Sequence, residues 1–134
     1  MKKIFIAAAA VLLANMANAE NCSMLSAEHQ KCIDKAMATT DIIECNSAES
    51  ARQDKVLNQV YKEVMKCLTK EKAEELKKGQ RAWLKLRDGN SGFMSDLTGG
   101  TIDGINSSSQ YAEDIAIRVQ YLQAIRDTVC EPAD

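Results

Sequence analysis

Cysteines are the residues of this 134-residue chain with the most obvious chemical potential. Their spacing contains no C-x-x-C pair, and the chain has a single histidine. A zinc site and a redox-active dithiol therefore lack their usual patterns. Disulfide bonds are the expected chemistry if the chain is exported. The five cysteines are Cys22, Cys32, Cys45, Cys67 and Cys130.

Cys32 and Cys45 flank the predicted turn between the first two helices, so we expect a disulfide between them. Such a bridge closes a loop of about 14 residues and would stabilise the fold by roughly 3 kcal/mol. Among the other three cysteines, the sequence allows either a Cys22–Cys67 or a Cys22–Cys130 disulfide and does not choose between them. Because five is an odd number, at least one thiol is free or pairs between molecules.

Two predicted helices carry polar and aromatic residues that could form a functional groove. These are Asp54, Asn58 and Tyr61 on one helix, and Gln80, Arg81, Trp83, Arg87 and Asp88 on the next. They could form a partner-binding surface anchored by the tryptophan. We favour an internal network, in which Asp54 pairs with Arg81 or Arg87, because buried donors and acceptors must be satisfied within the fold.

Enzymatic chemistry finds little support in the sequence. The single His29 has no partnered nucleophile in a recognisable arrangement, and we interpret it as an exposed helix residue. The glycines do not precede the Gly-Lys-Ser/Thr signature of a phosphate-binding loop. We therefore expect a protein that is not an enzyme, with no catalytic residues, no cofactor and no metal.

The N-terminus has the three parts of a secretory signal. Lys2 and Lys3 precede a short apolar run, and an Ala-x-Ala site ends at Ala19. The apolar run is shorter than the roughly 20 residues of a membrane-spanning helix. We expect 1–19 to be a cleaved signal peptide and 20–134 to be a single domain. That domain would be periplasmic or secreted, without a membrane anchor.

The charge of the mature chain limits its partners. Loss of two lysines with the signal lowers the formal net charge from −2 to −4. A mildly acidic domain is a poor candidate for binding nucleic acid, whose phosphates require a basic surface. The acidity suits a basic protein partner, although we favour the simpler interpretation that it maintains solubility.

The positions that must hold these residues are predicted to be helical. No Gly or Pro interrupts the first two segments, Thr69 is placed to cap the third, and Pro132 follows the last. We expect an all-α, up-and-down bundle of about four helices, stapled by disulfides. The expected helices are 26–38, 41–68, 70–87 and 111–129.

Residues 89–110 contain five of the six glycines and many serines, which predicts a long loop before the last helix. This loop is our candidate for contact with a partner. Its apolar side chains could enter a partner's cleft or fold back over the bundle, and we favour the second. The candidate contact residues are Phe93, Met94, Asp96, Leu97 and Asp103.

Three patterns between residues 39 and 88 are shared with a known family. They are Thr39-Thr40-Asp41 with Cys45, then Asp54-x-x-Leu57-Asn58-x-x-Tyr61, then Leu76-x-x-x-Gln80-Arg81-x-Trp83-Leu84-x-x-Arg87-Asp88. Taken together they resemble the lysozyme-inhibitor LprI-like family, over roughly residues 30 to 125.

The resemblance implies a small exported helical domain that binds lysozyme and inhibits it by occluding its cleft. Asp96 and Asp103 would then suit an acidic rim around the inserted element. Typical relatives have two cysteines approximately where this chain has Ser91 and Gln110, so their loop bridge is absent here. The alternative is a periplasmic interaction or immunity-type module for a co-exported bacterial protein.

Overall fold

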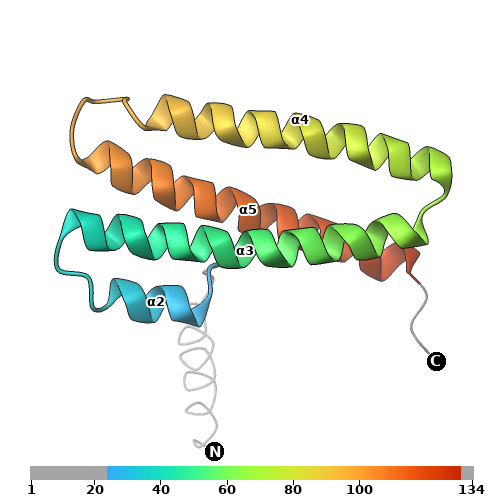
Figure 1. Cartoon of the computed structure of the whole chain (residues 1–134), viewed down its shortest axis with the longest axis horizontal. Coiled ribbons are helices and arrows are strands. Elements are labelled where there is room, and N and C mark those ends of the chain that lie inside the picture. Colours follow the sequence, from blue (N-terminus) through green and yellow to red (C-terminus); the bar gives the residue numbers. More distant parts are fainter. Residues whose placement is uncertain (1–23, 131–134) are drawn as a thin grey trace, which may run out of the picture.

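The computed structural model describes residues 24–130, which form four α-helices (Figure 1). The predicted all-α fold is confirmed. The proposed signal peptide at 1–19, Cys22 and Pro132 lie outside the described residues. The helices are α2 (Ala27–Ile33), α3 (Thr39–Cys67), α4 (Lys70–Met94) and α5 (Ile102–Val129).

Helices α3 and α5 lie side by side and run in the same direction (Figure 1). Helix α4 runs antiparallel along the other side of α5, and α2 packs against the first half of α3. The core is an apolar seam between α3 and α5, whose members recur every three or four residues and so share one helix face. The seam consists of Leu57, Val60, Val64, Ile115, Val119 and Leu122, each at most 5% exposed.

Local sequence signals begin the helices. The Ser26 hydroxyl accepts a hydrogen bond from the His29 amide at the start of α2, and Thr69 accepts one from the Lys72 amide at the start of α4. At the start of α3, the Asp41 carboxylate accepts from the backbone amides of Met37 and Ala38, at 2.9 and 3.0 Å. These contacts satisfy amides that have no partner within a helix.

Two disulfides staple α3 near both of its ends. Cys32–Cys45 joins α2 to α3, as predicted. Cys67–Cys130 joins the C-terminal ends of α3 and α5, so neither pairing that the sequence left open for Cys67 or Cys130 is present. Parallel packing of α3 and α5 places these two cysteines together, with Cα atoms 5.2 Å apart.

The prediction of a loop that spans residues 89–110 is wrong, because the connection is much shorter. Helix α4 continues to Met94 and α5 begins at Ile102, so only residues 95–101 connect them. The serines and glycines are accommodated because the helices meet closely here. Ser107 donates to the Ser91 carbonyl at 3.0 Å, and a Cβ on Gly104 would lie 3.0 Å from the Ile43 side chain. Tertiary contacts thus outweigh the low helix propensity of glycine.

We predict that replacing both Cys67 and Cys130 by serine lowers the free energy of unfolding by about 4 kcal/mol, because the bridge restricts a long loop in the unfolded chain. The matched double replacement of Cys32 and Cys45 removes a bridge that closes a shorter loop. It should lower the free energy of unfolding by about 3 kcal/mol. Urea denaturation of the three proteins measures both values. An unchanged stability without Cys67–Cys130 would contradict the stapling of α3 to α5.

Candidate functional site

Acidic residues without neighbouring Lys or Arg are concentrated in two segments of the sequence. Segments 36–51 and 88–117 contain eight acidic residues and no Lys or Arg, and we call them together the acidic end. In contrast, 55–85 contains nine Lys and Arg against four acidic residues. The acidic residues concerned are Asp41, Glu44, Glu49, Asp88, Asp96, Asp103, Glu113 and Asp114.

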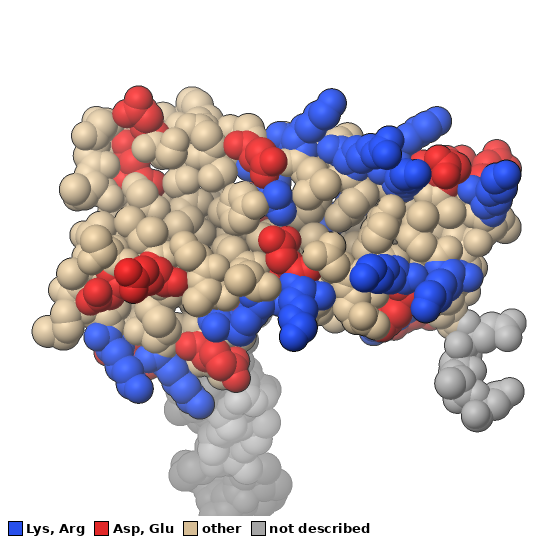
Figure 2. All heavy atoms as spheres, viewed as in Figure 1, with Lys and Arg blue, Asp and Glu red and all other residues tan. Residues whose placement is uncertain are grey.

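The helix arrangement gathers the two acidic segments at one end. The start of α3, the end of α4 and the start of α5 meet there (Figure 1). On the face shown in Figure 2, most Lys and Arg side chains lie in the opposite half, others project over α2, and red and tan residues cover the α4–α5 turn. The adjoining segment 24–35 is balanced, with two lysines and two acidic residues. The acidic end is therefore a distinct surface suited to cations.

The candidate contact residues divide into exposed and buried ones. Phe93 and Met94 occupy the last turn of α4, and Asp96 and Leu97 lie in the connection to α5. Phe93 is 67% exposed and Leu97 52% exposed, so the prediction that they fold back over the bundle is wrong. Two large apolar side chains thus project from the acidic end.

Asp103 cannot serve as a rim residue, because it is only 3% exposed and its oxygens are used internally. Its carboxylate accepts from the amides of Thr98 and Gly99, both at 2.9 Å, and from the Thr98 hydroxyl. The Thr98 amide chiefly holds the pKa of Asp103 below its ordinary value, against the opposing effect of desolvation. Asp103 closes the turn that Gly99, with φ 75°, makes possible.

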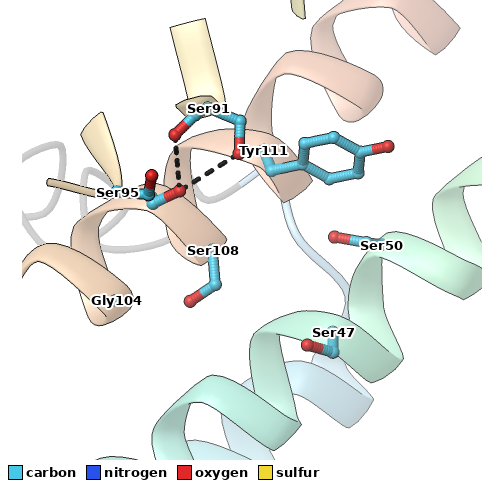
Figure 3. Close-up of a pocket in the computed structure, with 8 residues that line it drawn as sticks. Ser47, Ser50, Ser91, Ser95, Gly104, Ser108 and Tyr111 are labelled. Atoms are coloured by element: carbon cyan, nitrogen blue, oxygen red, sulfur yellow. Dashed lines mark hydrogen bonds between the residues drawn. The ribbon is translucent and has the colours of Figure 1, made fainter. Parts of the chain in front are cut away.

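A pocket of about 340 Å³ opens between α3 and the α4–α5 turn (Figure 3). Ser47 and Ser50 approach from α3, and the remaining lining residues come from the end of α4 and the start of α5. The lining consists of Ser47, Ser50, Ser91, Ser95, Gly104, Ser107, Ser108 and Tyr111. The site was not predicted from the sequence, because most of these serines lie in the segment that was expected to be a loop.

Arg87 is the only buried residue of α4 and lies at the centre of the polar residues shared with the LprI-like family. Its guanidinium lies 3.6 Å from Asp54, one of the two predicted pairings, and 3.0 Å from Asp88. It also packs over the rings of Trp83 and Tyr111, at 5.2 and 4.5 Å. Cation–π contact and ion pairing together explain how a charge is buried here.

A second guanidinium extends this stack. Arg118 of α5 lies 5.6 Å from the Trp83 ring and 4.6 Å from the Tyr121 ring, and donates to Gln80 at 2.8 Å. Rings and guanidinium groups thus alternate between α4 and α5. Burial lowers the pKa of Arg118 below its ordinary value. Arg81 and Asn58 are exposed and lie outside this stack.

Helix α2 is attached through Glu49, a fully buried carboxylate of α3. Glu49 accepts from the Ser26 amide at 2.8 Å, from the Ser26 hydroxyl at 2.6 Å, and from Arg52 and Gln53. Desolvation opposes its ionisation, but the hydrogen bonds from Gln53, Ser26 and Arg52 prevail and lower its pKa to about 2. Glu49 is therefore a charged structural anchor.

His29 is half-buried, so its interpretation as an exposed residue is wrong. Its Nε2 lies 2.8 Å from the Asn46 side-chain oxygen, and Asn46 donates to Ser108 at 2.9 Å. This chain of contacts connects α2, α3 and α5 behind the pocket.

Residues 24–130 contain no group of three or more His, Cys, Asp or Glu side chains placed to hold a metal ion. None of the described helices is both long and apolar enough to span a membrane.

Comparison with known proteins identifies the family. A family model described as "Lysozyme inhibitor LprI" matches residues 32–122, which is most of the chain. The chain belongs to the LprI family. No curated protein and no solved structure matches it. In this LprI-family chain the matched region spans the Arg87 stack, the serine-lined pocket and the α4–α5 turn.

We predict that Arg87→Ala lowers the free energy of unfolding by about 2 kcal/mol, because it removes two ring contacts and leaves Asp54 without its partner. Arg87→Lys keeps the charge but loses the planar stacking, and should recover only part of that loss. Urea denaturation measures both. An unchanged midpoint in Arg87→Ala would contradict a structural role for the stack.

We predict that stability falls as the pH drops from about 4.5 towards 2, since the lowered pKa of Glu49 stabilises the fold only while the side chain is ionised. Glu49→Gln should cost about 1–3 kcal/mol at neutral pH, because the Ser26 donors lose a charged acceptor. Its unfolding midpoint should then change less between pH 4.5 and 2.5. Parallel acid titrations showing equal slopes would exclude Glu49 as the responsible group.

Proposed function

We propose that this protein is an exported inhibitor of lysozyme-type peptidoglycan hydrolases, which it blocks by steric occlusion of their substrate cleft. Membership of the lysozyme-inhibitor family, over residues 32–122, carries this proposal. Inhibition in this way needs a surface that fits the enzyme and no chemistry of its own. We accordingly propose that the protein is not an enzyme and has a protein as its partner.

The acidic end is the surface we assign to the enzyme. Lysozymes are commonly basic, so the six carboxylates of the acidic end that are not buried complement them in charge. Phe93 and Leu97 project from the same end and can supply the apolar anchors that dominate protein interfaces. The Lys-rich half of the molecule would then face away from the enzyme.

The two disulfides support the proposal that the protein is exported. Two disulfides within one small domain are typical of proteins that fold in an oxidising compartment. We therefore place the protein in the periplasm or outside the cell, where peptidoglycan hydrolases act.

A turbidity assay of cell-wall lysis tests the function directly. Lysozymes of several types are incubated with equimolar mature protein, and lysis should slow for at least one of them. Absence of both slowing and binding across the panel would refute the proposal. Capture of a co-exported bacterial protein from the native envelope would then favour an interaction or immunity-type module.

We predict that reversing two exposed charges of the acidic end, Glu44→Lys with Asp96→Lys, weakens binding to an inhibited lysozyme at least about tenfold, mainly through slower association. The matched control reverses Glu71 and Glu74, two exposed carboxylates of the opposite half. This control should bind at least as tightly as the native protein. Surface plasmon resonance at two salt concentrations gives both rates, and equal losses in the two variants would exclude the acidic end.

A further inference from the structure

The serine hydroxyls that line the pocket at the acidic end all make hydrogen bonds within the protein. Five of its six serine hydroxyls donate to backbone carbonyls of the protein itself. These bonds are Ser47 to Ile43 at 2.8 Å, Ser50 to Asn46 at 3.1 Å, Ser95 to Gly92 at 2.8 Å, Ser107 to Ser91 at 3.0 Å, and Ser108 to Ile105 at 3.1 Å.

The sixth hydroxyl is also engaged. Ser91 Oγ lies 3.1 Å from Ser107 Oγ, and because the Ser107 proton is directed to a carbonyl, Ser91 is the donor in this pair. A hydroxyl carries one proton and two lone pairs. Each serine therefore has its proton occupied. Ser107 already accepts from Ser91 and Ser108 from Asn46, and the remaining lone pairs of the six oxygens are acceptors. Figure 3 labels five of these serines, with Ser47 and Ser50 on α3 facing Ser91, Ser95 and Ser108 from α4 and α5.

The remaining wall adds no unpaired positive charge to the pocket. Tyr111 contributes an aromatic ring, and the Arg87 guanidinium already lies over it, 4.5 Å from its centroid. Arg87 is itself paired with Asp54 and Asp88. No Lys or Arg lines the pocket, and the segments that form it, within 36–51 and 88–117, contain none either.

These features select among possible ligands. An anion would meet lone pairs instead of donors, and a hard metal ion would lack the carboxylates that such ions prefer. A volume of about 340 Å³ lies at the small end of ligand pockets and suits a single side chain. Ammonium and guanidinium groups carry only donors and a positive charge, so they match the lining.

We propose that this serine-lined pocket binds one lysine or arginine side chain of the basic hydrolase that the protein inhibits. The proposal rests on the proposed function for the identity of the partner, and on the pocket for the chemistry of recognition. The bound cation would donate to the serine hydroxyl oxygens of the pocket. Phe93 and Leu97 would make apolar contacts around this point.

The pocket is tested first without any enzyme. The mature protein is titrated with N-acetyl-arginine amide and with N-acetyl-lysine amide, and amide chemical shifts are followed by NMR. Saturable shifts should concentrate on the lining residues from Ser91 to Ser108. N-acetyl-citrulline amide, a neutral isostere of the arginine probe, should produce much weaker shifts. Absence of shifts with both cations, or equal shifts with citrulline or with N-acetylglucosamine, would overturn the proposal.

A tethered cation supplies the second test. Ser47 is exposed on α3, so Ser47→Lys should fold normally and place its own ammonium group at the pocket. Thr40→Lys adds the same charge to the acidic end outside the pocket. Binding to an inhibited lysozyme should weaken at least about tenfold in Ser47→Lys and less than about threefold in Thr40→Lys. Equal effects in the two variants would show that the pocket is not occupied.

The two tests separate the two proposals. Saturable binding of the cationic probes, with no lysozyme bound or inhibited, would refute the proposed function and leave the pocket as a site for another basic protein. Lysozyme inhibition that is insensitive to Ser47→Lys would refute the pocket and retain the function.

Discussion

The parallel packing of α3 against α5 is the constraint on which the rest of this structure depends. A continuous apolar seam from Leu57 to Val64 on α3 and from Ile115 to Leu122 on α5 excludes water between them. The Cys67–Cys130 bridge closes the seam where both helices end. Every other element is attached to this pair: α2 through Cys32–Cys45 and the buried Glu49, and α4 through the Arg87 stack.

The attachment of α4 explains how the molecule keeps its charges apart. Only Arg87 of this helix is buried, so most of its surface faces solvent and can carry lysines without desolvation. The stack of guanidinium groups and rings holds α4 against α5, together with Leu76 and Trp83, which pack against the core. Because α3 and α5 begin at the same end, their acidic first halves coincide there, and the pocket forms where α4 turns into α5.

Much of the fold could be predicted from the sequence, because helix periodicity, caps at Thr69 and Ser26, and uninterrupted segments are local signals. The Cys32–Cys45 bridge followed from the short turn between α2 and α3. The helical state of 89–94 and 102–110 could not be predicted, since it depends on contacts such as Ser91 with Ser107 that join distant positions. The pocket went unrecognised for the same reason.

Our central claim is that the acidic end, with its acceptor-lined pocket, is the surface that engages a basic peptidoglycan hydrolase. The most direct measurement is amide hydrogen exchange of the full mature protein, alone and bound to a lysozyme that it inhibits. We expect slowed exchange on binding to be concentrated in residues 88–108 and at the start of α3. Protection confined to residues 55–85, the Lys-rich half, would contradict it.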